Sequence, residues 1–538
     1  MARCRNLFLK RTSLAAGALT GSLTLYRSPA FRLIAALLCL APLASHAAAP
    51  EAPAAEWARC AVYADASPAE QADLRALQAA RAPALLWADG ERRRLLAAQL
   101  AGLVDDGLAP ADYPLPAETT AGWDACRDLA VSRSYLLALR HLAFGRLDQA
   151  RVEPFWRDQA ETRRQHDDWL ALAIAGLPAP EQAFDRARPA LASYQALRRA
   201  YAALRGAQLP DRWPALPAGP LLRPGMTDAR LPALARRLAD TGFLAAEEAA
   251  RPHPVHDLAL VAALEAFQRR HGLKVDGVLG PATLAALNIS PAARRDQLRA
   301  NLERLRWLAR DWEADMLLVD IAAAQLHLFR DGRPAWTTRT QVGRPARPTP
   351  QLKSRITHLT LNPTWTVPPT IFREDKLPQI LHDPAFLERH QFQVIDASGQ
   401  PVPAHAVDWA DPRGLRLRQA AGPDNPLGQV AIRFANPFAV YLHDTPSRRL
   451  FDGSERTFSS GCVRVEGALE LVERLLTPAE RTAVAERLAT GKTQQFNLAR
   501  PLPIVMAYWT ADADALGEIR YRPDVYQLDP PLVRALPR

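Results

Sequence analysis

A histidine and a cysteine in the C-terminal third of the sequence have the residue types and spacing of a base and a nucleophile. His443 ends an expected strand, and Cys462 follows nineteen residues later, at a glycine-led turn that we expect to precede a helix. A thiol attacks only as the thiolate, and a free cysteine, with a pKa of about 8.5, is mostly protonated near neutrality. A neighbouring histidine can take the proton, and a helix N-terminus would stabilise the anion. The pair therefore predicts covalent catalysis by a thiol.

The residues around this pair fit the same chemistry. Arg464 would add positive charge, Gly461 leaves room for a carbonyl group, and backbone N–H groups near Cys462 could hold an oxyanion. Asp444 follows His443, but adjacent residues of a strand point to opposite faces, so we expect a backbone carbonyl to orient the imidazole. The alternatives are an inert buried thiol, a strand-end histidine and, for the arginine, a surface ion pair.

Composition argues against two other classes of site. No Cys-x-x-Cys or His-x-x-x-His occurs, so we expect no metal and no cofactor. The formal net charge is +10, and six of the basic residues lie in the first fifty positions, which contain no acid. The remaining +4 is too small for a nucleic-acid surface, so nucleic acid is not an expected partner.

The N-terminal segment predicts export. Arg32 precedes a short apolar run over 33–40, and Ser45-His46-Ala47 is a small-x-small cleavage pattern, so residues 1–47 are expected to be a signal peptide. The run is short for a transmembrane helix, and an uncleaved anchor is the alternative.

Export changes the interpretation of the cysteines. The mature chain would keep Cys60, Cys126 and Cys462, and in an oxidising compartment two of the three can pair. Cys60 and Cys126 are the candidates for a disulfide, with two separate buried thiols as the alternative. Cys462 would then remain free.

The length of 538 residues predicts several domains, and the periodicity changes along the chain. Helical spacing of apolar residues, as in 91–103, predicts a helical region over 48–215. Beyond residue 314 the pattern is that of strands, and we expect a mainly β domain over 314–528. An irregular, partly helical insertion at 371–425 could act as a lid.

Between these regions, residues 222–288 predict a small helical unit. An amphipathic helix leads to a turn at Asp276-Gly277, and Pro281 begins a second helix, a position that proline favours. Its marker residues resemble those of the peptidoglycan-binding domain of many wall enzymes: Phe267-Gln268, His271-Gly272-Leu273, Asp276-Gly277, Gly280, Thr283 and Leu287-Asn288.

The stretch around Cys462 also carries a resemblance. His443 together with Ser459-Ser460-Gly461-Cys462-Val463-Arg464 resembles the signature of the L,D-transpeptidase catalytic domain. The Ser-Ser form resembles the large periplasmic branch of that family. This resemblance implies a multi-domain α+β fold: a helical scaffold, a small three-helix peptidoglycan-binding domain, and a mainly β catalytic domain with a partly helical capping insertion. It also implies a periplasmic location, with membrane contact only through the export signal.

The same resemblance implies roles for individual residues. Cys462 would be the nucleophile, His443 the general base, and Arg464 would orient or stabilise the site. Many members carry histidine where Ser460 stands, which leaves His443 as the base. Further residues would shape or line the substrate pocket: Trp365, Tyr441, Arg456, Ser459, Ser460 and Gly461. A plain core position is the alternative for Trp365 and Tyr441.

The activity implied is the formation of 3→3 cross-links between peptidoglycan stem peptides through a cysteine acyl-enzyme. The partners would be the donor and acceptor tetrapeptide stems, with other wall-synthesis proteins as further partners, and carbapenems would acylate the cysteine. Hydrolysis as an L,D-carboxypeptidase, or attachment of a lipoprotein, would use the same residues. A non-catalytic wall-binding protein that works through 222–288 is an alternative from another class. The residues that flank Cys462 do not match papain-like proteases.

Overall fold

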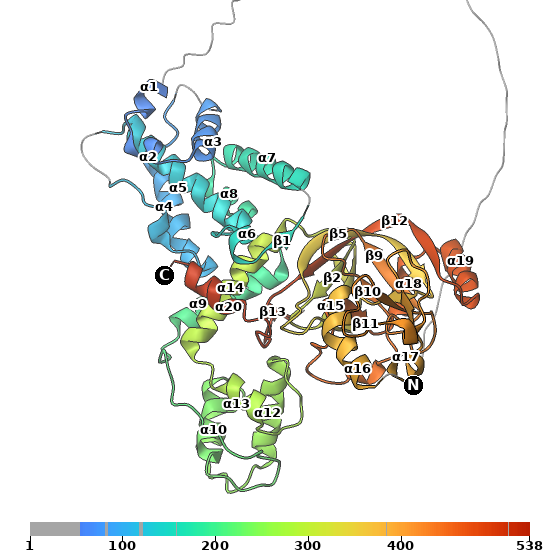
Figure 1. Cartoon of the computed structure of the whole chain (residues 1–538). Coiled ribbons are helices and arrows are strands. Elements are labelled where there is room, and N and C mark those ends of the chain that lie inside the picture. Colours follow the sequence, from blue (N-terminus) through green and yellow to red (C-terminus); the bar gives the residue numbers. More distant parts are fainter. Residues whose placement is uncertain are drawn as a thin grey trace, which may run out of the picture. The chain divides into compact units, whose positions relative to one another are not determined.

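The computed structural model describes residues 54–80, 84–117, 122–157, 159–383, 385–514 and 516–537 (Figure 1). The predicted signal peptide lies outside these residues. The chain divides into two units, Met1–Glu51 and Ala52–Arg538, and the second contains every helix and strand described below. In the described part of the chain, no helix is both long and apolar enough to cross a membrane.

The N-terminal region is helical, as its periodicity predicts. Its helices are α1 (Ala54–Trp57), α2 (Ala61–Ala64), α3 (Pro68–Ala79), α4 (Gly90–Gly102), α5 (Ala125–Phe144), α6 (Gln149–Val152), α7 (Gln159–Ala175), α8 (Pro180–Ala187) and α9 (Ala192–Gly206). Ser67 and Glu70 form a capping box that starts α3. Trp87, Tyr135 and Phe184 are fully buried in the core between these helices.

A disulfide joins Cys60 and Cys126, which lie 66 residues apart. It connects the start of α2 to the first turn of α5, and Cys60 is buried in the same core. The structure therefore pairs the two cysteines that the sequence identified as candidates, and Cys462 is a free cysteine.

Residues 222–288 contain α10 (Leu231–Asp240), α11 (Ala246–Ala249), α12 (Leu258–Arg270) and α13 (Pro281–Leu287) around a small apolar core. Gln268 holds the turn between α12 and α13, because its side-chain oxygen accepts from the N–H groups of Asp276 and Gly277 at 3.0 Å. Its amide nitrogen donates to the carbonyl oxygen of Val278 at 3.0 Å. The marker residues of this unit thus have a structural role in closing its turn.

Helix α14 (Pro291–Ala309) follows, and the sequence patterns did not predict it. It is buried along most of its length although it carries many charges. Arg304 pairs with Glu153 at 2.6 Å and with Asp529 at 2.5 Å, and Arg306 pairs with Glu303 at 2.5 Å. Because these three charges are paired, this part of the helix can lie inside the protein without isolated ions.

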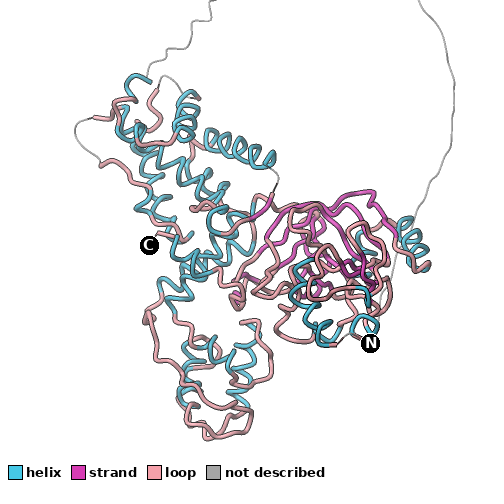
Figure 2. Tube along the Cα trace, in the orientation of Figure 1, coloured by secondary structure: helices cyan, strands magenta, loops and turns pink. Residues whose placement is uncertain are grey.

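The C-terminal region is built on one large sheet, which Figure 2 shows as the concentration of strands in the molecule. The strand order is β1-β5-β12-β2-β3-β4-β11-β10-β9, and β9 also pairs with β5, so the sheet closes on itself. The strands are β1 (Phe155–Trp156), β2 (Met316–Asp320), β3 (Gln325–Arg330), β4 (Arg333–Gln341), β5 (Gln351–Leu361), β9 (Val430–Phe434), β10 (Leu442–His443), β11 (Val463–Val465) and β12 (Gln494–Ala507). β1 comes from the N-terminal helical region and pairs with β5 in parallel.

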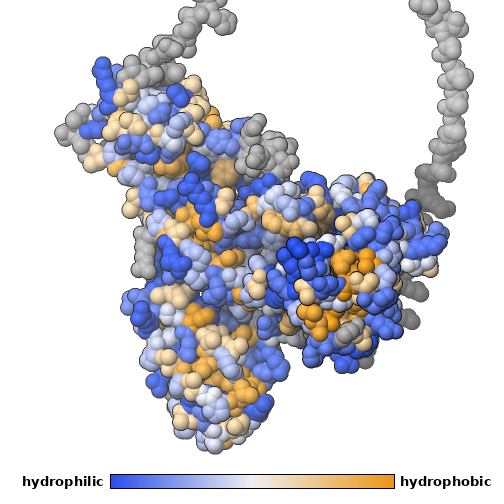
Figure 3. Space-filling view, in the orientation of Figure 1, coloured by the Kyte–Doolittle hydropathy of each residue, from blue (hydrophilic) through white to orange (hydrophobic). Residues whose placement is uncertain are grey.

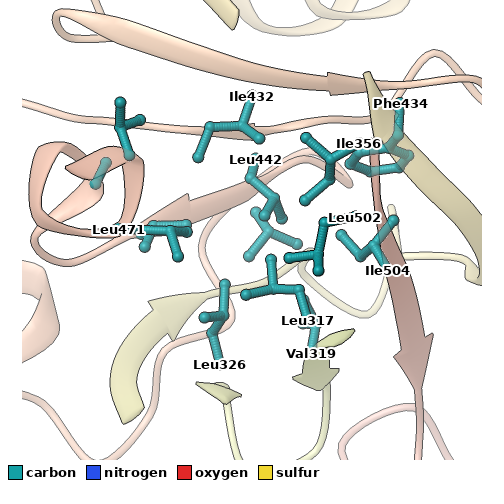
Figure 4. Close-up of a cluster of buried hydrophobic side chains, with 14 of the residues drawn as sticks. Leu317, Val319, Leu326, Ile356, Ile432, Phe434, Leu442, Leu471, Leu502 and Ile504 are labelled. Carbon is teal, nitrogen blue, oxygen red and sulfur yellow. The ribbon is translucent and has the colours of Figure 1, made fainter. Parts of the chain in front are cut away.

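Alternation along these strands separates two faces of the sheet. Leu317 and Val319 of β2 belong to the central apolar cluster, together with Ile432 of β9 and Leu442 of β10 (Figure 4). The alternate residues of β2, such as Leu318, pack against α14 and α9 in a second cluster. The remaining C-terminal helices are α18 (Ala468–Leu475), α19 (Pro478–Ala489) and α20 (Asp529–Ala535).

The insertion at 371–425 contains more strand than the sequence predicted. Its helical part comprises α15 (Pro369–Ile371), a π-helical turn η3 (Phe372–Lys376), α16 (Leu377–His382) and α17 (Phe386–Arg389). A separate three-stranded sheet then has the order β6-β8-β7, from β6 (Trp365–Thr366), β8 (Arg416–Gln419) and β7 (Phe392–Ile395). The insertion has an apolar cluster of its own, which includes Val367, Phe372 and Leu417.

The predicted fold class, a multi-domain α+β protein, is confirmed: the N-terminal region is helical and the C-terminal region is rich in β-sheet. On the face shown in Figure 3, hydrophilic side chains cover most of the described surface, with patches of hydrophobic side chains between them.

Candidate active site

The register of two short strands, β10 and β11, sets the position of the predicted base and of the segment that follows the predicted nucleophile. β10 and β11 are parallel, with Leu442 opposite Val463 and His443 opposite Arg464. Leu442 and Val463 are fully buried in the central core. Side chains alternate along a strand, so His443 and Arg464 point to the other face. Tyr441 and Cys462 come just before the two strands: the Tyr441 ring lies 5.7 Å from that of His443, and Cys462 also packs against the edge of the central core.

His443 is buried, with 4% of its surface exposed, and its ring is held by the backbone. Its Nδ1 lies 2.5 Å from the carbonyl oxygen of Asp444. A carbonyl oxygen can only accept a hydrogen bond, so Nδ1 carries the proton and Nε2 presents a lone pair. Burial and the positive charge of Arg464 lower the His443 pKa to about 3, so the imidazole is neutral near pH 7.

Asp444 does not act on the imidazole through its carboxylate. One carboxylate oxygen accepts from the Gln429 N–H at 3.0 Å, and the other pairs with Arg448 at 2.7 Å. The expectation that a backbone carbonyl orients His443 agrees with this geometry.

Cys462 is half-buried, and burial raises the pKa of its thiol. Hydrogen bonds from Tyr441 and the positive charges of Arg433 and Arg464 lower that pKa, but burial is the larger effect. Burial therefore favours a protonated thiol and a neutral imidazole in the resting site over a thiolate and an imidazolium. Two cavities, of about 1240 and 460 Å³, lie elsewhere in the described residues, and Cys462 lines neither of them.

One expectation about Cys462 is wrong. The residue does not precede a helix but leads directly into strand β11, and the next helix begins only at Ala468. A helix dipole acts only within about one turn of the helix end, so the expected helix directly after Cys462 is not there to stabilise the thiolate. The charges that favour the thiolate come instead from arginine side chains.

The turn before Cys462 is fixed by hydroxyl groups. The Ser459 hydroxyl donates to the carbonyl oxygen of Cys462 at 2.5 Å and accepts from the N–H of Gly461 at 3.1 Å. The Thr349 hydroxyl donates to the carbonyl oxygen of Gly461 at 2.8 Å. Gly461 has a φ of +110°, a conformation that other residues rarely adopt, which explains the glycine at this position.

Arginines flank the thiol on both sides. Arg464 donates to the side-chain oxygen of Gln341 at 3.1 Å, and burial lowers its pKa. Arg433, on β9, stacks its guanidinium 3.8 Å from the centre of the Tyr441 ring. The sequence patterns singled out neither Gln341 nor Arg433; only the strand register shows that they share a face with Cys462.

The other predicted pocket residues have different surroundings. Ser460 accepts from Arg347 at 3.0 Å, and Arg347 also pairs with Asp375 of the insertion at 2.7 Å. Trp365 lies just before the insertion and packs against it, with its ring 5.9 Å from that of Phe392.

Arg456 is engaged away from the thiol. Its guanidinium donates to the carbonyl oxygens of Ala323 at 2.8 Å and Gly453 at 2.9 Å, contacts that hold the segment leading to the turn. The structure brings together Cys462, His443, Arg464, Tyr441 and the turn residues. That Trp365 and Arg456 line the substrate pocket remains a prediction. No group of three or more His, Cys, Asp or Glu side chains among the described residues is arranged to hold a metal ion.

Comparison with protein families gives three matches along the chain. Residues 314–488 match the L,D-transpeptidase catalytic domain, residues 72–200 match a family described as "Scaffold domain", and residues 227–287 match a "Putative peptidoglycan binding domain". These matches confirm the resemblance stated from the sequence, in the same order along the chain.

A curated relative from Haemophilus influenzae, named "Putative L,D-transpeptidase", is 34% identical over 238 residues, which are 43% of this chain and 48% of that protein. The match thus spans about half the length of the relative. An L,D-transpeptidase from Stackebrandtia nassauensis is 14% identical and covers 55% of this chain and 97% of its own, with a TM-score of 0.19. An L,D-transpeptidase solved in complex with imipenem is 16% identical and covers 36% of this chain and 59% of its own, with a TM-score of 0.15.

Proposed function

Since the chain carries an L,D-transpeptidase catalytic domain together with a scaffold domain and a peptidoglycan-binding domain, we propose that it forms 3→3 cross-links in peptidoglycan through a Cys462 acyl-enzyme. The observation that supports this proposal is the parallel pairing of β10 with β11, which puts His443 opposite Arg464, two residues after Cys462. The donor would be a tetrapeptide stem, and the acceptor the side-chain amine of a diaminopimelate on a neighbouring stem.

In the first half of the reaction, the neutral His443 takes the thiol proton at Nε2 while the sulfur attacks the carbonyl carbon before the terminal D-alanine. The C–N bond breaks, His443 returns the proton to the departing amine, and free D-alanine leaves a thioester on Cys462. In the second half, the acceptor amine attacks the thioester and gives its proton to His443. The C–S bond breaks, the new amide forms, and the proton returns to the Cys462 sulfur.

The backbone of the turn would stabilise the oxyanion. The N–H of Gly461 is bonded to Ser459, and the N–H of Val463 donates to the carbonyl oxygen of Tyr441 at 3.1 Å. We therefore assign the N–H of Cys462 itself as an oxyanion donor, since it belongs to the residue that forms the tetrahedral centre.

We further propose a periplasmic enzyme. The Cys60–Cys126 disulfide supports this location, because disulfides persist in oxidising compartments. The unit at 222–288 would hold peptidoglycan near the catalytic domain, so that donor and acceptor stems lie within reach.

Intact-protein mass spectrometry after incubation with a carbapenem, followed by a muropeptide assay, tests the proposal. We expect one adduct on the wild type and none on Cys462→Ala, and a cross-linked dimer from purified tetrapeptide muropeptides. Hydrolysis without dimer formation when the acceptor stem is present would identify an L,D-carboxypeptidase instead. Dimer formation by Cys462→Ala would exclude the acyl-enzyme.

A further inference from the structure

Arg433 places a positive charge near Cys462. Among the described residues, no carboxylate forms an ion pair with this arginine. Its Nε donates to the Thr360 hydroxyl at 3.3 Å, and its guanidinium lies 3.8 Å from the centre of the Tyr441 ring. Both contacts position the guanidinium and neither neutralises its charge. The neighbouring catalytic-domain arginines differ, since Arg339 pairs with Glu466 at 2.5 Å and Arg448 with Asp444 at 2.7 Å.

The register of the sheet places Arg433 in line with the thiol. β9 and β10 are antiparallel, with Leu442 opposite Ile432 and His443 opposite Ala431, so the next pair is Tyr441 opposite Arg433. Cys462, Tyr441 and Arg433 therefore follow one another across three adjacent strands. Strands are about 4.8 Å apart, so the backbone of Arg433 lies about 10 Å from that of Cys462, with the Tyr441 ring between them.

The titratable groups that face Arg433 do not neutralise its charge, so this side of the thiol is electropositive. The titratable side chains around it are Cys462, Tyr441, His443 and, from β5, His358, which lies opposite Arg433 in the sheet. Burial and Arg433 lower the pKa of His358, and His443 is neutral. None of these four side chains is an anion near neutrality in the resting site.

The donor stem of the proposed reaction carries the missing anion. Its terminal D-alanine has a free carboxylate one residue beyond the carbonyl that Cys462 attacks, and consecutive residues are about 3.8 Å apart. A donor whose scissile carbonyl lies at the sulfur and whose chain crosses β10 would present that carboxylate over Tyr441. A guanidinium has five N–H donors, so one that lies over an aromatic ring can still bind a carboxylate through two parallel hydrogen bonds.

We propose that Arg433 binds the terminal carboxylate of the donor stem and thereby selects stems that end at the residue to be released. This inference rests on the proposed function. Arg433 is a specificity residue in this scheme, whereas Arg464 lies on the other side of Cys462 and is bound to Gln341. Longer stems, and stems whose terminus is blocked, would lack the carboxylate at this position.

The test compares two donors, a tetrapeptide stem with a free terminal carboxylate and the same stem as the terminal carboxamide. Release of the terminal residue is measured as kcat/KM for the wild type, Arg433→Gln and Arg433→Lys. The control is Arg413→Gln, an exposed arginine whose partner Asp411 lies in the same loop of the insertion. Each protein is also titrated with a carbapenem, to show that the thiol remains reactive.

We expect the wild type and Arg413→Gln to prefer the carboxylate donor by about 10–100-fold, the range for hydrogen bonds to charged groups. Arg433→Gln should use the two donors within about threefold of each other, because the loss falls on the carboxylate donor alone. If Arg433 had a purely structural role, its substitution would instead lower kcat/KM for both donors equally and leave the ratio of the two values unchanged. If Arg433→Gln does not fold, Arg433→Lys provides the test, because lysine keeps the charge but cannot form the bidentate hydrogen bond. The preference of this variant for the carboxylate donor should fall severalfold.

An unchanged preference in the folded Arg433 variant would overturn the inference and leave the proposed function intact. A wild type that uses neither donor, although it is acylated by the carbapenem, would overturn the proposed function and the inference with it. A wild type that uses both donors equally would overturn the inference alone.

Discussion

The Nδ1 atom of His443 lies 2.5 Å from the backbone carbonyl oxygen of Asp444, the next residue in the chain. Because the peptide group cannot change its charge, this contact fixes the tautomer of the imidazole at every pH at which the ring is neutral. The base at this site is therefore oriented by the backbone, and the adjacent carboxylate has other partners. The consequences can be measured.

Asp444→Asn should leave acylation nearly intact. The side chain bonds to Gln429 and Arg448, so its charge is not needed at the imidazole. We expect a loss of less than about tenfold in the rate of carbapenem acylation, far below the ~10⁴-fold that follows this change in a Ser-His-Asp triad. His443→Gln, which removes the base, should lose about 10²–10⁴-fold in the same stopped-flow assay. Equal losses in the two variants would show that the carboxylate takes part in catalysis.

Acylation should not depend on pH through the range where histidines usually titrate. The His443 pKa is lowered to about 3 by burial and by Arg464, so lowering the pH protonates the base only near that value. The neutral, active form is present above it. We therefore expect protonation of His443 to cause no change in kcat/KM for acylation between about pH 5 and pH 8. A histidine with an ordinary pKa would instead make kcat/KM fall below about pH 6.5. A half-loss near pH 6.5, measured over a pH range in which circular dichroism shows the protein folded, would contradict the low pKa.

Thr349→Val should weaken the turn that presents Cys462. The Thr349 hydroxyl donates to the Gly461 carbonyl at 2.8 Å and accepts from the Gly343 N–H at 2.8 Å, and both contacts are buried. Removing it leaves two buried polar groups without a partner, which costs about 1–3 kcal/mol each. We expect a lower unfolding midpoint and slower acylation, whereas Thr349→Ser, which keeps the hydroxyl, should retain most of both. If valine were tolerated as well as serine, the hydroxyl would not be what holds the turn.

Glu153→Ala should destabilise the protein without touching the active site. Glu153 is 2% exposed and pairs with Arg304, which is 4% exposed, at 2.6 Å. Breaking a buried pair from one side costs about 3–5 kcal/mol when the remaining charge has no other partner. Arg304 keeps Asp529 at 2.5 Å, so we expect a loss of stability below that range. The thermal midpoint should fall clearly, while the acylation rate below the transition stays that of the wild type. Asp411→Ala, which breaks the exposed pair with Arg413, is the control and should change the midpoint little.

The parts of the fold that followed from the sequence are those with a local signal. Strands β2 and β3 and the turn at Asp331-Gly332 show as short β-rich runs with a turn dipeptide between them. Cys462 and His443 could be predicted as nucleophile and base because their flanking residues form a specific motif. Strand β11 was mistaken for the start of a helix, since three residues are too few to show a period of two.

Other parts depend on distant residues and could not be found in the same way. Helix α14 carries many charges on its buried faces, because Arg304 and Arg306 meet carboxylates inside the protein. A hydrophobic pattern does not reveal such a helix. Arg433 has the ordinary appearance of a polar residue on a strand, and only the pairing of β9 with β10 brings it toward Cys462.

The parallel pairing of β10 with β11 also bears on protein engineering. The two strands are joined by residues 444–462, but their register is set by hydrogen bonds to each other and to β9 and β4, and not by the length of that connection. Its middle, around Gly453 and Ser454, is exposed. A fluorophore-bearing peptide inserted there would leave the reactive pair in place, so this loop is a site for labelling the enzyme in its active form.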